Sequence, residues 1–178
     1  MSILLALLGI IVGLFIFIFV AALFIKKEYT IRKQITIEKN DREVYNYVRL
    51  LKNQEYYNKW VMMDPNVKRT YAGIDGRIGA IVTWDSENKN VGKGEQEIKS
   101  LTADSRMECE VRFEKPFKNV AQVYMELTPI SESTTTLEWG MLGQNKYPFN
   151  LMNLFIGGML AKDMQTSLQN LKNVIEKQ

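Results

Sequence analysis

The 178-residue sequence contains no histidine and only one cysteine, Cys109. Without histidine it lacks the commonest general base, the commonest metal ligand and every Ser-His or Cys-His nucleophile pair. A single cysteine cannot form an internal disulfide or the paired-cysteine spacing of a zinc site. We therefore expect no catalytic residues, no metal and no cofactor, and a binding role is favoured over an enzymatic one.

The sequence also lacks a block of charge of one sign. The net charge is +3, residues 1–25 carry no charged side chain, and beyond them Lys and Arg alternate with Glu. A nucleic-acid surface needs a basic stripe or patch. We therefore expect no nucleic-acid partner.

Cys109 lies in a stretch of strict alternation. Met107, Val111 and Phe113 share its phase, and the residues between them are charged. A free cysteine in such a position behaves as a small apolar side chain. The pattern therefore predicts a core residue and not a reactive thiol.

The one long apolar run is Ile3 to Ile25, interrupted only by Gly9 and Gly13. About 20 helical residues cross the hydrocarbon core of a bilayer, so this run is long enough. Lys26 and Lys27 follow it, and the positive-inside rule then places the C-terminal side in the cytoplasm. We predict that residues 1–27 are a single-pass transmembrane signal-anchor with a basic flank, which makes the membrane a partner.

A cleaved secretory signal is the alternative, since Val20-Ala21-Ala22 loosely resembles a cleavage site. No Lys or Arg precedes the run, however, and it exceeds the usual signal core of roughly 7–15 residues. A retained anchor is favoured. The spacing of Gly9 and Gly13 also matches a helix-pairing motif, which is a weak signal in a single span.

Residues 28–178 are predicted to form one domain, which begins with a strand and two short helices and continues with a series of strands. Asn40 and Glu43 form a capping-box pair at the start of a helix, and a second short helix is expected over 54–60. Alternating residues and turns predict six or seven antiparallel strands. The expected strands are 29–37, 67–71, 79–84, 91–101, 107–113, 120–128 and a last one through Thr135, Leu137, Trp139 and Met141.

A long helix is predicted from Pro148 to Lys177. Its apolar residues recur at three- and four-residue steps, and proline suits a first helical turn. The stripe consists of Leu154, Ala161, Met164, Leu168, Leu171 and Ile175. A sheet with one apolar face needs a cover, so we expect an α+β fold in which a curved antiparallel sheet grips this helix.

The order of elements, with the phrases Trp60-Val61-Met62-Met63-Asp64-Pro65, Gly92-Lys93-Gly94-Glu95-Gln96-Glu97-Ile98 and Leu168-x-x-Leu171-Lys172, resembles the SRPBCC superfamily over residues 28–177. Within it, the chain looks most like the bacterial membrane-anchored members labelled polyketide cyclase or dehydrase-like. The superfamily also contains the START lipid-transfer domains and the Hsp90-activator-homology proteins. The resemblance implies a helix-grip fold with a largely apolar cavity between sheet and helix, and most members bind hydrophobic ligands.

Strand phase then indicates cavity candidates. Gln96 shares the inward phase with Ile98, and an inward Gln needs a partner from the backbone, water or a ligand. Gly92 and Gly94 in the same strand predict a bulge or strong curvature. The aromatic candidates Trp60, Trp84 and Trp139, with Met125 on an inward phase, are ligand-binding candidates for which ordinary core roles remain open.

The start of the last helix is apolar on nearly every side. Phe155 and Met159 are the ligand-binding candidates there, and Gly157-Gly158 lies between them. A helix that is apolar all round is buried or faces lipid or ligand. Two interpretations of the glycine pair stay open: close packing on the sheet, or a kink or lid at the cavity entrance.

Three functions follow from this sequence. We favour a membrane-tethered binding module for a hydrophobic small molecule or lipid. A cyclase- or dehydrase-like enzyme would need an acid/base pair inside the cavity, formed by Asp, Glu, Tyr or Lys. A protein-interaction module would have a filled interior and an exposed apolar patch.

Overall fold

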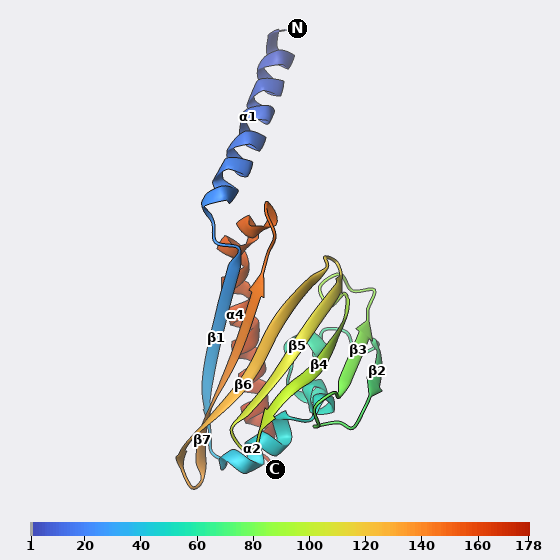
Figure 1. The fold of residues 1–178 in the computed structure, drawn as a ribbon, viewed down its shortest axis with the longest axis vertical. Coiled ribbons are helices and arrows are strands. Elements are labelled where there is room, and N and C mark those ends of the chain that lie inside the picture. Colours follow the sequence, from blue (N-terminus) through green and yellow to red (C-terminus); the bar gives the residue numbers. More distant parts are fainter. Residues whose placement is uncertain (1) are drawn as a thin grey trace.

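The structure is a computed structural model that describes residues 2–178 (Figure 1). An apolar helix projects from one end of a curved sheet, and a long C-terminal helix lies against that sheet. The elements in chain order are α1 Ser2–Phe24, β1 Glu28–Ile37, α2 Asp41–Val48, the 3-10 helix η1 Leu51–Tyr56, α3 Lys59–Met62, β2 Lys68–Ala72, β3 Ile81–Asp85, β4 Lys93–Thr102, β5 Arg106–Lys115, β6 Asn119–Ser131, β7 Thr134–Gln144, the 3-10 helix η2 Phe149–Met152 and α4 Asn153–Ile175.

The sheet has seven strands in the order β1-β7-β6-β5-β4-β3-β2, and every neighbouring pair is antiparallel. Strands β2 to β7 are joined in sequence order, while β1 pairs with β7 and places Ile31 opposite Met141. Buried and exposed side chains alternate along β4 to β7, as the sequence pattern predicts. The predicted antiparallel sheet is confirmed.

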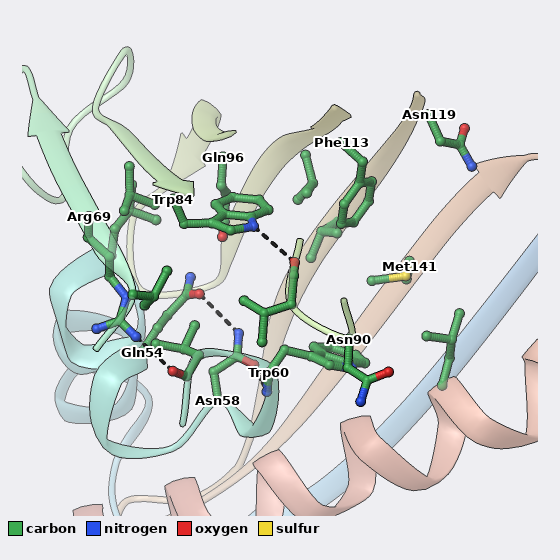
Figure 2. A pocket seen from close by; sticks show the side chains of 18 of the residues that line it. Gln54, Asn58, Trp60, Arg69, Trp84, Asn90, Gln96, Phe113, Asn119 and Met141 are labelled. Atoms are coloured by element: carbon green, nitrogen blue, oxygen red, sulfur yellow. Dashed lines mark hydrogen bonds between the residues drawn. The ribbon is translucent and has the colours of Figure 1, made fainter. Parts of the chain in front are cut away.

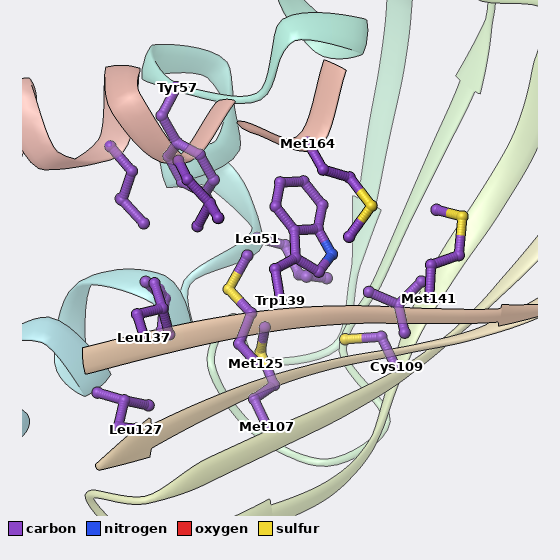
Figure 3. Packing of buried hydrophobic residues seen from close by; sticks show 14 of the residues in the cluster. Leu51, Tyr57, Met107, Cys109, Met125, Leu127, Leu137, Trp139, Met141 and Met164 are labelled. Carbon is purple, nitrogen blue, oxygen red and sulfur yellow. The ribbon is translucent and has the colours of Figure 1, made fainter. Parts of the chain in front are cut away.

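The core lies between the inner face of the sheet and α4 (Figure 3). The predicted stripe is confirmed in the second half of the helix, where Met164, Leu168, Leu171 and Ile175 are buried. Its beginning differs from the prediction. Pro148 precedes a 3-10 turn, and α4 starts only at Asn153. This offset leaves Leu154 62% exposed, so it does not belong to the buried stripe.

The short helices differ in detail from the sequence prediction. Asn40 caps α2 as expected, because its Oδ1 accepts from the Glu43 backbone N–H at 2.8 Å and its Nδ2 donates to the Glu43 carboxylate at 2.8 Å. The single helix predicted over 54–60 is instead two pieces, η1 and α3. Asn58 divides them, since its side chain caps α3 by accepting from the Trp60 N–H.

The bend of the sheet depends on two glycines in and beside β4. Gly92 has φ +64°, and the pairing of β4 with β5 shifts register between Lys93 and Gly94. A Cβ at Gly94 would lie 2.7 Å from the Trp84 ring, so only glycine allows the indole to cross the strand there. The two glycines therefore coincide with a local irregularity of the sheet, at the place where the sequence predicts a bulge or strong curvature.

Helix α1 stands clear of the sheet except at its C-terminal end, where it contacts η2 (Figure 1). The residues from Ile3 to Val20 are exposed. Ile3–Phe24 is long and apolar enough to cross a membrane, and a signal sequence would have the same properties.

Packing of α4 on the sheet generates a stability prediction. Leu168 is fully buried, so we expect Leu168→Ala to lower the free energy of unfolding by about 2–5 kcal/mol. Leu154→Ala on the same helix is the matched control and should change it by less than about 0.5 kcal/mol. Urea unfolding of the full chain in detergent micelles, followed by tryptophan fluorescence, measures both. Equal effects of the two variants would contradict this orientation of α4.

Candidate functional site

A cavity of about 340 Å³ lies between the inner face of the sheet and the first turns of α4 (Figure 2). Strands β2 to β7 supply one wall through inward residues such as Val82, Val111 and Val123. The segment from η1 to α3 closes a second side, and Ile156 and Leu160 of α4 a third. The volume is within the range of small-molecule sites, roughly 300–1,000 Å³.

Two edge-to-face aromatic pairs form much of the cavity wall. The ring centroids of Trp60 and Trp139 are 5.9 Å apart, and those of Trp84 and Phe113 are 6.2 Å apart. The Trp84 Nε1–H donates to the Val91 carbonyl at 3.2 Å, which fixes the indole (Figure 2). The Trp139 Nε1–H is buried and has no partner among the described residues. This part of the wall is therefore apolar, and the Trp139 N–H is buried within it.

The buried polar side chains of the wall are neutral amides. Gln54 and Asn58 face each other, and the Asn58 Nδ2 donates to the Gln54 Oε1 at 3.1 Å (Figure 2). Gln96 is buried on the opposite side, beside Cys109. These amides offer hydrogen bonds to a ligand without adding charge to the cavity.

Charged groups line only one edge of the cavity. The Arg69 Nη2 donates to the Val61 carbonyl at 2.7 Å, and its Nη1 lies 3.3 Å from the Glu55 carboxylate. Tyr71 donates to Glu55 at 2.7 Å, and burial, together with this bond, raises the pKa of the Tyr71 hydroxyl. Sequence reasoning missed this trio. The shared phase of Arg69 and Tyr71 in the predicted strand was the only available signal.

Within residues 2–178, no cluster of three or more His, Cys, Asp or Glu side chains could hold a metal ion. The Arg112 side chain instead gathers carboxylates on the outer face of the sheet, with its Nε 2.6 Å from Glu95 and its Nη2 2.9 Å from Glu97. Glu110 also pairs with it. These three carboxylates therefore lie on the face of the sheet that points away from the cavity.

No family model matches the chain, and no curated protein sequence matches it either. Solved structures do match. Norcoclaurine synthase from Thalictrum flavum, in complex with dopamine and hydroxybenzaldehyde, has a TM-score of 0.64 at 7% identity and covers 84% of this chain and 87% of its own. The Aha1 dimer from Colwellia psychrerythraea has a TM-score of 0.58 at 11% identity, with coverage of 83% and 96%. Ara h 8.0201 has a TM-score of 0.61 at 9% identity, with coverage of 85% and 99%.

The chain has a helix-grip fold like that of these solved structures. Its curved seven-stranded sheet and long C-terminal helix match theirs over most of the chain, so the predicted fold class is confirmed. At these identities the likeness concerns the fold and not the ligand.

The helix-grip cavity brings together four of the predicted site residues: Trp60, Trp84, Gln96 and Trp139 line it. Met125 does not, because it is buried deeper in the core near Met107 and Trp139 (Figure 3).

Phe155 and Met159 do not line the helix-grip cavity either. They are 78% and 58% exposed, and their neighbours Ile156 and Leu160 take the inward positions. One residue turns a helix by about 100°, so an apolar run gives no phase by itself.

Two tyrosines near the cavity differ in exposure, since Tyr57 is fully buried while Tyr56 is exposed. Asp64 stabilises a turn, because it accepts from the Asn66 N–H at 3.0 Å and from the Ser86 hydroxyl. A Cβ at Gly157 or Gly158 would meet nothing within 4 Å, so close packing of that glycine pair is wrong, and the lid interpretation stays a prediction.

Cys109 provides a chemical check on the core behind the cavity. Burial raises the pKa of its thiol to about 11, although the Gln96 amide opposes this. Because the thiolate is the reactive form, we expect the folded protein at neutral pH to react with iodoacetamide about 100-fold more slowly than the urea-unfolded chain. Mass spectrometry of the alkylated protein gives both rates. Equal rates would mean that solvent reaches this core.

Proposed function

We propose that the protein is a membrane-tethered binding module that holds a hydrophobic small molecule or lipid in the helix-grip cavity. The observation that carries the proposal is the 340 Å³ cavity itself, with its tryptophan walls and buried amides. Binding sites for small molecules are concave and mostly apolar, with a few fixed polar groups. An interaction module with a filled interior would not need such a hollow.

The polar groups favour a neutral ligand. Gln54, Asn58 and Gln96 carry no charge, and the Arg69 guanidinium is already paired with Glu55. Bringing an unpaired carboxylate or ammonium into this wall would cost its hydration without supplying a partner. We therefore infer an apolar molecule with one neutral hydrogen-bonding group, such as an alcohol, ester or amide.

An enzymatic function is less well supported. Glu55 is the acidic residue of the wall, and it is held by Arg69 and Tyr71 at an exposed edge instead of facing the tryptophans. The matching norcoclaurine synthase structure, with its two aromatic molecules, supports the capacity of this fold for small organic ligands.

We further propose that residues 1–27 are a retained transmembrane anchor for a domain formed by residues 28–178. The support is the exposed apolar surface of α1, followed by Lys26 and Lys27. By the positive-inside rule, the helix-grip domain then lies on the cytoplasmic side of a single-pass protein.

Native mass spectrometry of the full chain, purified in mild detergent, tests the binding proposal. We expect a co-purifying neutral hydrophobic molecule. Val123→Phe, which directs a ring into the cavity from β6, should lower its occupancy and weaken binding of a pyrene-labelled long-chain alcohol at least about tenfold.

Val120→Phe, on the exposed phase of the same strand, is the matched control and should bind like the wild type. Binding is measured by energy transfer from the cavity tryptophans to pyrene, and thermal unfolding verifies that both variants fold. A ligand-free wild type that also fails to bind the probe would contradict the proposal.

The anchor has its own test. We expect the protein from the native host to stay with membranes during alkaline carbonate extraction and to have the intact mass of a chain that retains residues 3–25. A released protein that begins near Ala22 would show instead that this segment is a cleaved signal.

A further inference from the structure

Exposed apolar side chains gather at the end of the domain from which α1 projects. They come from the β5–β6 turn, from η2 and from the first turn of α4. We define this apolar rim as Phe117, Phe149, Met152, Leu154 and Phe155. The Phe117 and Phe149 ring centroids are 6.2 Å apart, so the separate segments meet in one patch. Contiguous apolar surface of this kind marks an interaction site.

The rim lies beside the last turns of α1, at the same level along the axis of that helix. The Tyr147 hydroxyl, two residues before Phe149, donates to the Phe19 carbonyl at 3.2 Å, and the Phe19 and Tyr147 rings are 6.0 Å apart. Phe19 precedes the end of α1 by five residues, which is about 7 Å along the helix. If α1 spans a bilayer, this loop reaches the headgroup and acyl boundary, where amphipathic aromatic residues are enriched.

Hydrogen bonds fix this arrangement. The Asn150 Nδ2 donates to the Ala22 and Ile25 carbonyls, both at 2.7 Å, and Ala22 is buried. The Asn153 Nδ2 donates to the Lys26 and Lys27 carbonyls at 2.9 and 3.0 Å. These contacts set the orientation of the domain relative to α1, with the rim at the end of the domain from which α1 projects.

The charges around the rim suit a lipid surface. Lys26, Lys27, Lys118 and Lys146 are exposed, and none of them forms an ion pair within residues 2–178. Glu28 is the acidic residue at the start of β1. Lysines beside an apolar patch are the composition that binds anionic headgroups.

The rim adjoins one end of the cavity. Pro116 and Ile156 line the cavity, and each is the chain neighbour of a rim residue, Phe117 or Phe155. Asn119 and Asn145 also line the cavity, and the Asn119 Nδ2 donates to the Asn145 Oδ1 at 3.2 Å.

We propose that the apolar rim inserts into the bilayer that α1 spans, so that this end of the cavity faces lipid and cargo passes between bilayer and cavity without crossing water. This inference rests on the proposed anchor. It adds an interaction surface, its occupant and a route for the ligand.

The test places the fluorophore NBD on single introduced cysteines in the full chain, reconstituted in vesicles that contain anionic lipid. Phe117→Cys and Phe155→Cys report on the rim, and Leu14→Cys reports on α1. Ile130→Cys, at the far β6–β7 turn and similarly exposed, is the matched control. Wild-type protein with its buried Cys109 is the labelling blank. Lipids with a nitroxide near the headgroup end of the acyl chain are the quenchers for the rim positions and Ile130, and lipids with a nitroxide near the chain end are the quenchers for Leu14, which lies in the middle of α1.

We expect quenching at Leu14, Phe117 and Phe155 that exceeds quenching at Ile130 several-fold. Quenching at Leu14 with rim positions no different from Ile130 would overturn rim insertion while leaving the anchor intact. A protein that neither floats with the vesicles nor is quenched at Leu14 would show that the anchor is wrong, and the rim proposal would fall with it.

The route for cargo has a separate readout. The double variant Phe117→Ser/Phe155→Ser should take up the pyrene-labelled alcohol from vesicles several-fold more slowly than the wild type, with the same final energy transfer. Ile130→Ser should match the wild type. An unchanged uptake rate in the double variant would overturn the route through the rim.

Discussion

The last carbonyl groups of a helix have no donors within that helix, and the end of α1 meets this need with asparagine side chains. Asn150 donates to the Ala22 carbonyl in the last turn of α1 and to the Ile25 carbonyl just beyond it, and Asn153 donates to the Lys26 and Lys27 carbonyls of the segment that follows. Water could serve equally well at an exposed end. The use of side chains from η2 and α4 instead couples the direction of α1 to the position of the helix that closes the cavity.

The same amides continue into the cavity mouth. The Asn145 Nδ2 donates to the Asn153 Oδ1 at 2.6 Å, and Asn119 donates in turn to Asn145. Two side chains that line the cavity are thus linked to the residues that hold α1. On the opposite side, Gly94 admits the Trp84 ring across β4. The opening is therefore set at one end by the junction with α1 and at the other by the curvature of the sheet.

The sequence predicted the strands and the second half of α4 because their periods are unambiguous, as in Met107–Phe113 and Met164–Ile175. It also predicted the inward phase of Gln96. It could not tell that Ile156 and not Phe155 points into the cavity. The residues around them are nearly all apolar, and the 3-10 turn η2 shifts the start of the helix. The contacts of Asn150 with α1 join residues about 125 positions apart, beyond the reach of local patterns.

If the rim inserts into the bilayer, as we propose, the ligand enters the cavity from lipid, and this changes what can make the cavity selective. A ligand taken from water gains the full hydrophobic term on entering an apolar cavity, about 25 cal/mol per Å² of apolar area buried. A ligand already dissolved in lipid gains little of it, because acyl chains are as apolar as the wall. Discrimination among molecules dissolved in the membrane must then come from two sources. One is how well the shape of the ligand fits the aromatic pairs of the wall, and the other is hydrogen bonds to Gln54, Asn58 and Gln96. Those neutral amides, and not the apolar area, would determine which lipid-soluble molecule is held.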